Sequence, residues 1–544
     1  MKKTTETSST FLSKQIIVLL LVVATAIAAI LHCLNSGFPP LNSDEAAFGY
    51  NTYSIVQTGR DEYGNLLPTR FKSFGEYKLP LMGYLSVPFV AVLGLNELST
   101  RAVVILIGIA SPLLFYAIAQ QLFKNNRISI TAAFLAALTP WIQMTSRHAH
   151  EAIVAYLFLM LSFIITIKLL EQVTIKRVIL LAGLNVLALF SHHIAKPYSV
   201  FLLLWLGIAL WQQRLSRGYW IKTLLIFLIP IAIFMVTELQ HPSNRIGNLV
   251  FYNNQGFTLA IDEMRGEDNN RIIHNKAIQG VSFLTNQYLS YFSPEFLVTN
   301  GDQNERFGYA GISPISVVEY VLALIGLYFL FHLKNRYRYF IVSLLLTAPL
   351  TASLSWAGYS LTRSFMMIVP ILLLASYGAY NLVLELKQNS LRRLVIIGSL
   401  AAYLFFIFLS WDFYFNHYPK RAQAIRAWTS GYKELGSYLK ANYERFDKFY
   451  ITKKHGQPYI YTLFYLNYPP AKYQDTAELS TPDEYGFGQV ERFDKFEFNF
   501  KQPTAGEKAA YIGFPDDFQG TGIEESQVKK IQIGTETIFW IYES

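Results

Sequence analysis

Long runs of apolar residues fill the first three quarters of the chain. Eleven of these charge-poor runs are long enough to cross about 30 Å of hydrocarbon as helices. They lie near residues 15–34, 102–123, 128–146, 150–170, 178–195, 197–213, 219–238, 316–333, 339–356, 364–386 and 394–411. After residue 411 such runs stop. The pattern therefore predicts an α-helical polytopic membrane domain over residues 1–411 and a soluble domain over residues 412–544.

The tail has the mixed pattern of a small α/β domain. A helical pattern covers residues 421–446, and strand-like runs follow near residues 448–453, 508–514, 529–534 and 537–544. Turn-forming Pro, Gly and Asp residues separate these runs. We expect this domain to fold against the outer mouth of the bundle.

Composition excludes a water-soluble globule. Of the 544 residues, 52% are hydrophobic and only 15% are charged, against roughly 25% charged in soluble proteins. The net charge is +9, yet the tail holds 16 Lys and Arg against 18 Asp and Glu, so the positive excess belongs to the membrane part. This distribution indicates topology signals and no nucleic-acid binding. Cys33 is the only cysteine, so an intramolecular disulfide is excluded.

Lys and Arg residues predict the orientation in the membrane. The first apolar run is too long for a signal peptide and is expected to stay as a span. With the N-terminus in the cytoplasm, the inner connections hold sixteen Lys and Arg, and the three short outer connections hold one each. The positive-inside rule therefore predicts a multi-pass protein of the cell (plasma or inner) membrane with its C-terminal domain outside. Two long segments, residues 35–101 and 239–315, then lie outside as well.

Candidate chemistry gathers on the predicted outer side. Asp44 and Glu45 directly follow the first span, where Ser43 suits an N-cap and the helix dipole favours acids. Isolated cations stand at the outer ends of other segments: Lys78, Arg147, Lys196 and Arg363. Contact with lipid headgroups explains any one of them. As a set beside a carboxylate, they indicate a site for a lipid-linked phosphosugar.

Histidines form a second group on the same side. His148, His150, His192 and His193 fall in two short outer connections, near Glu151. They have two interpretations: hydrogen bonding to phosphate or sugar, or a divalent metal site, since imidazole and carboxylate suit zinc. Glu76, in the first outer segment, is a further candidate for a sugar, acceptor or metal contact. No other cofactor is indicated.

Several outer segments together resemble a known superfamily. They read NSDEAAFGYNTYSIVQTGRDEYG, GEYKLPLMGYLSVPFVAVLGLNELSTR, SRHAHEAIVAYLFLML, SHHIAKPYSVFLLL, LSYFSPEFLVTNGDQNERFG and RSFMMIVPILLLASYG. In this order they are similar to the bacterial protein O-mannosyltransferase and aminoarabinose-transferase relatives of the GT-C glycosyltransferases. The resemblance covers most of residues 35–385.

The resemblance implies an enzyme that takes a sugar from a polyprenyl-phosphate carrier and passes it, with inversion, to an outer acceptor (protein, lipid or cell-wall glycan). It implies Asp44 as the catalytic base, Glu45 as its support and Lys78 as a donor phosphate contact. Leu79 stands where relatives have the first proline of a pair, and Ala47 stands where some have a phosphate-binding Arg. Lys196 replaces an Arg, which keeps the charge but loses the bidentate fork. Arg363 and Arg147 complete the expected cations.

Two other functions fit parts of the pattern. A transporter or flippase for lipid-linked or anionic solutes would carry ionisable residues near the bilayer midplane, whereas the charges here cluster at span ends. A polysaccharide polymerase or ligase would differ in using an oligosaccharide carrier as donor.

Overall fold

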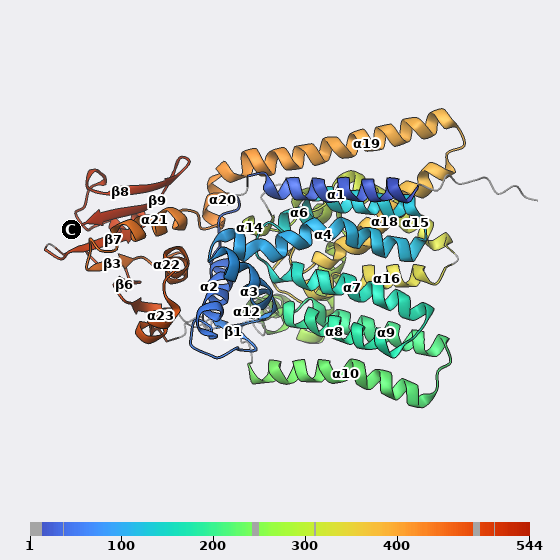
Figure 1. The fold of residues 1–544 in the computed structure, drawn as a ribbon, viewed down its shortest axis with the longest axis horizontal. Helices are drawn as coiled ribbons and strands as arrows, with labels where there is room; N and C mark the ends of the chain where they lie inside the picture. Colours follow the sequence, from blue (N-terminus) through green and yellow to red (C-terminus); the bar gives the residue numbers. More distant parts are fainter. Residues whose placement is uncertain are drawn as a thin grey trace, which may run out of the picture.

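The computed structural model describes residues 13–544 except Ser36, Gly75, residues 242–249 and 309–311, Lys334, residues 482–489 and Ala505. The side chain of Glu76 also lies outside the description. Figure 1 shows a bundle of long helices with a sheet domain at one end. We call the end of the bundle that faces the sheet the site end.

A helix stands at each of the eleven predicted spans. These helices are α1 (Lys14–Cys33), α4 (Glu97–Phe123), α5 (Asn126–Leu138), α7 (Glu151–Glu171), α8 (Ile175–Ser191), α9 (Ala195–Gln212), α10 (Arg217–Gln240), α15 (Val317–His332), α16 (Tyr337–Thr347), α18 (Ile368–Glu385) and α19 (Asn389–Asp412). Within the described residues, six helices are long and apolar enough to cross a membrane. The predicted polytopic α-helical fold is confirmed, and the chain has the architecture of a multi-pass membrane protein.

Proline divides two of the predicted spans. The run near 128–146 is split into α5 and α6 (Pro140–Thr145), and the run near 339–356 into α16 and α17 (Leu350–Ser353). Pro140 and Pro349 stand at the breaks. A proline ring lacks the N–H that a continuing helix needs, so the chain turns there.

Glycines let two central helices touch. A Cβ at Gly326 of α15 would lie 1.9 Å from the carbonyl oxygen of Leu374 in α18, and one at Gly378 would lie 2.1 Å from that of Leu322. Small residues at helix crossings allow this close approach inside a membrane. The α15–α18 pair is therefore fixed by backbone contact.

The segment between α1 and α4 covers the site end. It contains α2 (Ser43–Thr58), the hairpin of β1 (Phe71–Ser73) and β2 (Glu76–Lys78), and α3 (Leu81–Leu93). In Figure 1, α2 lies across the ends of the spans, between the bundle and the sheet domain. The apolar α3, with 13 residues, is too short for a span and was not predicted as one.

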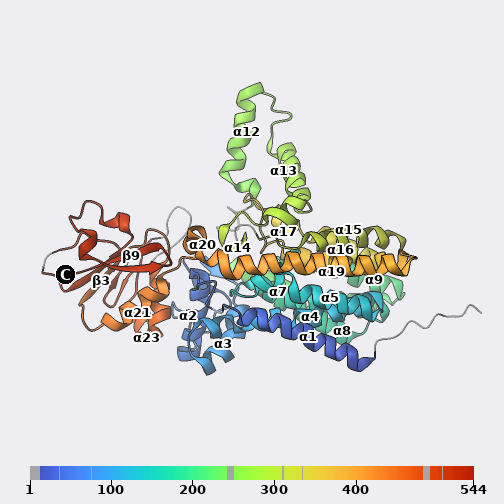
Figure 2. The same cartoon turned by 90° about the horizontal axis from the view of Figure 1, so that it is seen from above.

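A second long segment follows α10. It contains η1 (Phe251–Asn253), α12 (Gln255–Asp268), α13 (Lys276–Ser290), η2 (Glu295–Asn300) and α14 (Glu305–Gly308). Helix η3 (Phe365–Met367) lies further along the chain, between α17 and α18. Figure 2 shows α12 and α13 projecting sideways from the site end, across the direction of the spans. We call residues 255–290 the arm.

The C-terminal domain is α/β, as predicted. Its helices are η4 (Phe413–His417), η5 (Tyr418–Lys420), α20 (Ala422–Ala427), α21 (Tyr432–Asn442), α22 (Pro458–Leu466), α23 (Pro470–Thr476), η6 (Pro515–Phe518) and η7 (Glu525–Gln527). Its strands are β3 (Lys448–Ile451), β4 (Glu478–Leu479), β5 (Val490–Phe493), β6 (Phe496–Glu497), β7 (Ala509–Gly513), β8 (Lys529–Ile533) and β9 (Glu536–Glu543). The described strands of this domain form one sheet in the order β4-β5-β6-β3-β7-β9-β8, with β3 parallel to β6 and β7.

Helix α2 is held from both sides. A Cβ at Gly49 would lie 2.6 Å from the Phe464 ring of α22 and 2.6 Å from the Thr100 hydroxyl of α4. The Tyr50 hydroxyl donates to the carbonyl oxygen of Tyr468 at 3.0 Å. The sheet domain therefore packs directly on the helix that begins with Asp44 and Glu45.

Candidate active site

The N-terminus of α2 carries the two predicted acids. Asn42 is the N-cap: its side chain accepts from the Glu45 N–H at 3.1 Å, and Glu45 Oε2 accepts from the Asn42 N–H at 3.1 Å. This capping box places the cap one residue before Ser43, which forms the first helical residue instead. Both Asp44 and Glu45 lie in the first turn, where the helix dipole stabilises negative charge.

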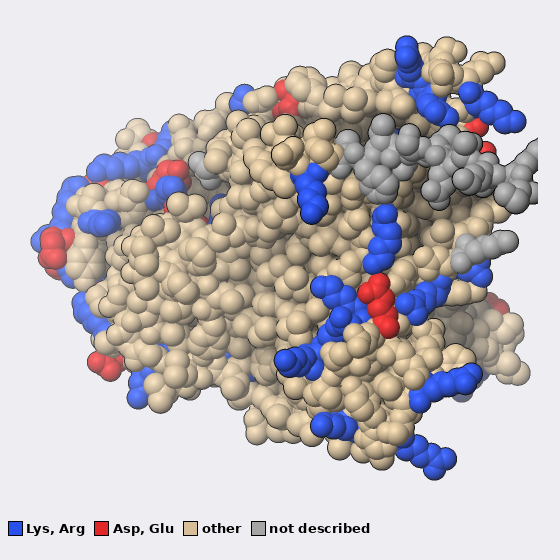
Figure 3. Space-filling view, turned by 45° about the vertical axis from the view of Figure 1, so that its right-hand side comes forward, with Lys and Arg blue, Asp and Glu red and all other residues tan. Residues whose placement is uncertain are grey.

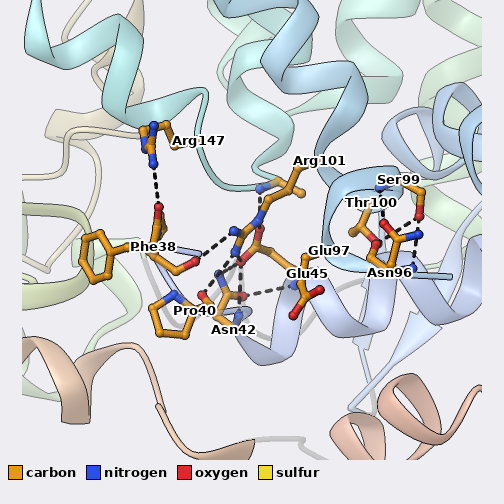
Figure 4. A network of polar contacts seen from close by, with 12 residues as sticks. Phe38, Pro40, Asn42, Glu45, Asn96, Glu97, Ser99, Thr100, Arg101 and Arg147 are labelled. Atoms are coloured by element: carbon orange, nitrogen blue, oxygen red, sulfur yellow. Dashed lines mark hydrogen bonds and ion pairs between the residues drawn. The ribbon is translucent and has the colours of Figure 1, made fainter. Parts of the chain in front are cut away.

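Glu45 forms hydrogen bonds and an ion pair with three surrounding residues. Its side chain is buried and pairs with Arg101 of α4 through two contacts, Nε to Oε1 at 2.7 Å and Nη2 to Oε2 at 2.8 Å. The Ala149 N–H also donates to Oε1 at 2.6 Å. Figure 4 shows Glu45 between Asn42 and Arg101. These contacts tie α2 to α4 and to the connection before α7.

Asp44 meets Lys78. Lys78 Nζ lies 2.5 Å from Asp44 Oδ1, with 44% of the Asp44 side chain exposed and 11% of the Lys78 side chain. The Lys78 ammonium also lies over the rings of Phe48 and Phe74, at 5.2 and 4.7 Å from their centroids. The β1–β2 hairpin thus brings a largely buried cation to an accessible carboxylate.

His150 lies among the same charges. As the N-cap of α7, its Nδ1 accepts from the Ala152 N–H at 3.1 Å, so the proton of the neutral ring is on Nε2. Burial lowers the pKa of His150 to about 4, the Asp44 carboxylate opposes this, and the nearby cations Arg306, Arg363 and Lys78 lower it further. At neutral pH the ring is uncharged.

His192 extends the site toward α9. Its ring centroid lies 5.5 Å from that of His150. Burial holds the pKa of His192 well below its usual value, and His150, His193, Arg363 and Lys196 reinforce the shift. The Arg363 charge lowers the pKa of both histidines, so it lies near both. Its guanidinium also donates to the Ser355 hydroxyl.

Lys196 belongs to an ion-pair cluster. Its Nζ lies 2.6 Å from Glu238 Oε2, and Arg70 Nη2 lies 2.9 Å from Glu238 Oε1. The Arg70 guanidinium stacks on Phe190 and Phe234. Burial and the neighbouring Lys196 lower the pKa of His193 to about 4. The sequence analysis missed Glu238 and Arg70, since nothing in the chain marked them as partners of Lys196.

Arg147 binds backbone carbonyl oxygens. Its guanidinium donates to the carbonyl oxygens of Leu31, Leu34, Asn35 and Phe38 at 2.5 to 2.8 Å. These oxygens end α1 and begin the next segment, where a helix leaves carbonyls unsatisfied. Figure 4 shows Arg147 reaching Phe38, apart from the Glu45–Arg101 pair. Arg147 therefore caps α1, and its expected contact with the donor phosphate stays a prediction.

Arg306 of α14 was missed although it lies within the segment LSYFSPEFLVTNGDQNERFG. Its charge lowers the pKa of both His148 and His150. His148 is buried edge-on against Trp428 at 5.4 Å between centroids. A cation in a segment already matched to the superfamily was the signal that could have found it.

The four histidines form a chain of rings. Consecutive centroids lie 6.0 Å apart from His148 to His150, 5.5 Å from His150 to His192 and 6.2 Å from His192 to His193. Glu151 Oε2 is 3.9 Å from His150 Nδ1. Over the described residues, no three His, Cys, Asp or Glu side chains come together in a way that could hold a metal ion. Glu76 falls outside this search.

A cavity of about 560 Å³ lies beside the Glu45 network. Its lining joins residues 37–41, the start of α4 and the segment between η5 and α21, with Arg101 and Arg147 among them. Neither Asp44 nor Lys78 lines it. The cavity is therefore separate from the Asp44–Lys78 pair.

Comparison with known proteins gives a fold and no family. No protein-family model and no curated protein matches the sequence. The fold, a polytopic bundle with a sheet domain at one end, occurs in solved structures of membrane glycosyltransferases. ArnT from Cupriavidus metallidurans in the apo state matches with a TM-score of 0.52 at 11% identity, over 96% of this chain and 97% of that one. The same protein bound to undecaprenyl phosphate gives 0.51 at 12% identity, over 97% and 98%.

A third structure is the oligosaccharyltransferase of Archaeoglobus fulgidus tethered to an acceptor peptide, with a TM-score of 0.49 at 12% identity. It is matched over 84% of this chain, which spans 63% of that protein's length. The likeness to ArnT shows that this chain shares that protein's fold, in agreement with the fold expected from the sequence.

Proposed function

We propose that this protein is a membrane glycosyltransferase. It moves a sugar from a polyprenyl-phosphate-linked donor to an extracytoplasmic acceptor, with inversion at the anomeric carbon. The observation that carries the proposal is the Asp44–Lys78 pair at the site end, where an accessible carboxylate contacts a largely buried ammonium. The charges of Asp44, Lys78, Arg363 and Arg306 all act on the pKa of the nearby His150. The ArnT fold supports it.

The chemistry needs a base and a cationic pocket. Asp44 removes the proton of the attacking acceptor hydroxyl. The hydroxyl oxygen then bonds to the anomeric carbon from the side opposite the phosphate, the bond from that carbon to the phosphate oxygen breaks, and its electron pair leaves with the polyprenyl phosphate. Positive charge fixed near the departing phosphate lowers the barrier. The departing polyprenyl phosphate is stable as an anion and leaves without protonation, so no acid is required.

The cations divide by position. Lys78 stands beside the base, and the charge of Arg363 acts on both His150 and His192. The Lys196 charge also lowers the pKa of His192, and its ammonium pairs with Glu238. We assign Lys78, Lys196 and Arg363 to the donor phosphate and add Arg306. His150, neutral with its proton on Nε2, donates a hydrogen bond without adding charge.

The site end faces the outside in this proposal. Figure 3, which turns the opposite end of the bundle forward, shows many Lys and Arg and few Asp and Glu on the surface there. That asymmetry is typical of the cytoplasmic side. The acceptor and the sheet domain then lie outside the cell, and the donor reaches the site from the outer leaflet.

The test is Asp44→Asn in the purified full-length protein. With radiolabelled polyprenyl-phosphate sugars, we expect release of one label by the parent protein and a roughly 10²–10⁴-fold loss in the variant, the range of a missing general base. Asp262→Asn, an exposed acid of α12, is the matched control and should retain full activity. Binding of the donor should survive in Asp44→Asn, because the cations remain.

Two outcomes would contradict the proposal. Near-normal turnover by Asp44→Asn would remove Asp44 as the base. Movement of the labelled lipid across proteoliposomes, with no glycosidic product from any donor, would indicate a flippase instead.

A further inference from the structure

The arm is a helical hairpin with a rigid base. Phe251, Phe257, Phe283 and Trp356 form a small aromatic cluster where it leaves the bundle. The Tyr288 hydroxyl donates to the carbonyl oxygen of Leu346 at 2.8 Å, at the site end of α16. These contacts fix the level of the arm at the ends of the spans.

The two helices of the arm expose different faces. The exposed residues of α13 carry no charge: Ala277, Ile278, Val281, Ser282, Thr285, Asn286 and Leu289. Ile278, Val281 and Leu289 form its apolar stripe, and Val281 is 68% exposed. A surface of this kind is unfavourable in water and is typical of a helix that lies in a membrane interface.

Helix α12 exposes the opposite character. Asp262, Glu263, Glu267 and Asp268 are all exposed, and Leu259 is its only large apolar side chain of that kind. In Figure 2, α13 lies on the side of the bundle and α12 on the side of the sheet domain. Helix α13, which carries the uncharged face, is thus nearer the bundle, and α12, which carries the acidic face, is nearer the sheet domain.

The apolar stripe continues an exposed apolar surface of the bundle. Leu346, Leu350 and Leu354, at the α16–α17 end beside α13, are all exposed, and lipid covers such residues on a spanning helix. At the tip, Ile272 is 81% exposed beside Arg271. An apolar side chain next to a cation suits the boundary between acyl chains and headgroups.

We propose that the arm lies in the interface of the leaflet at the site end, with the Ile278–Val281–Leu289 stripe of α13 in contact with lipid and the acidic face of α12 in water. This inference uses only the placement of the arm and its exposed side chains, so it stands apart from the proposed enzymatic activity.

The test uses single labels on the full chain. In a Cys33→Ala background, Val281→Cys and Glu263→Cys each receive an environment-sensitive NBD fluorophore, and the proteins are placed in nanodiscs of phosphatidylcholine and phosphatidylglycerol. We expect a blue-shifted emission at position 281 and at least about twofold stronger quenching there by spin-labelled lipid than at position 263. Iodide in the buffer should show the reverse order.

Three results would overturn the inference. Equal iodide quenching at both positions would place the stripe in water. A blue shift at 281 without lipid quenching would mean that protein, such as a second copy of the chain, covers it. Stronger lipid quenching at 263 would invert the orientation. Ile278→Cys repeats the measurement if Val281→Cys does not purify as a folded protein.

Discussion

Replacing the buried Glu62 by glutamine should change how stability depends on pH. Glu62 is fully buried between the first outer segment and α22, where the Tyr459 hydroxyl donates to its Oε1 at 3.3 Å. Within the described structure its Oε2 has no hydrogen-bond partner. Burial raises the pKa of Glu62 to about 8, Asp61 adds to the shift, and Lys78 with the hydroxyls of Tyr459 and Tyr63 opposes it.

The sign and size follow from this pKa. Between pH 4.5, the ordinary value, and about 8, the folded protein keeps a proton on Glu62 that the unfolded chain has lost. Stability therefore falls as the pH rises through this window and levels off above it. At 1.36 kcal/mol per unit, the rise from pH 6 to 8 removes about 2 to 3 kcal/mol of the free energy of unfolding.

Thermal unfolding followed by tryptophan fluorescence, in one detergent at pH 6, 7, 8 and 9, measures this effect. The parent protein should lose Tm between pH 6 and 8, and Glu62→Gln should lose clearly less because an amide does not ionise. Glu267→Gln, an exposed acid of the arm, should follow the parent. Parallel curves for the parent and Glu62→Gln would refute the reasoning.

Three further substitutions test the packing around the site. Glu45→Gln should cost about 3 to 5 kcal/mol by leaving Arg101 buried without its partner, seen as a lower Tm that Glu45→Gln combined with Arg101→Met partly restores; an unchanged Tm in the single variant would contradict this. Gly326→Ala should separate α15 from α18 and lower the Tm, whereas Gly398→Ala, with no atom within 4 Å of the new Cβ, should not; equal effects would argue against backbone contact. Gly49→Val should loosen α2 from α22, measured as faster protease cleavage between the bundle and the sheet domain.

The architecture could be predicted from the sequence because apolar residues partition into lipid and charged residues stay in water. Each of the eleven apolar runs became a helix, since a backbone in hydrocarbon must satisfy its own hydrogen bonds. Prolines that divided two of these runs were visible too, but whether Pro140 or Pro349 ends a helix depends on its neighbours. The arm was not foreseen, because α12 and α13 are too polar to read as spans.

The site could be predicted only in part, because the sequence does not show which charged residues pair with each other. Asp44 and Lys78 were chosen separately and lie in contact. Arg147 was added as a fourth cation to Lys78, Lys196 and Arg363. It binds carbonyls at the end of α1, whereas Lys196 binds a carboxylate of α10. That difference depends on where the carbonyls of Leu31, Leu34, Asn35 and Phe38 point, which the hydrophobic pattern does not predict. Arg101 was hidden because it stands directly before an apolar run, near the start of α4.

Helix α2 packs against both the sheet domain and the helical bundle, so it connects the two parts of the molecule directly. Gly49, where both press on the helix, is five residues from Asp44, about 7.5 Å along the axis. A tilt of the sheet would swing the carboxylate directly, with no relay of intervening side chains. A partner that binds the sheet domain could therefore change the position of the Asp44 carboxylate through α2 alone.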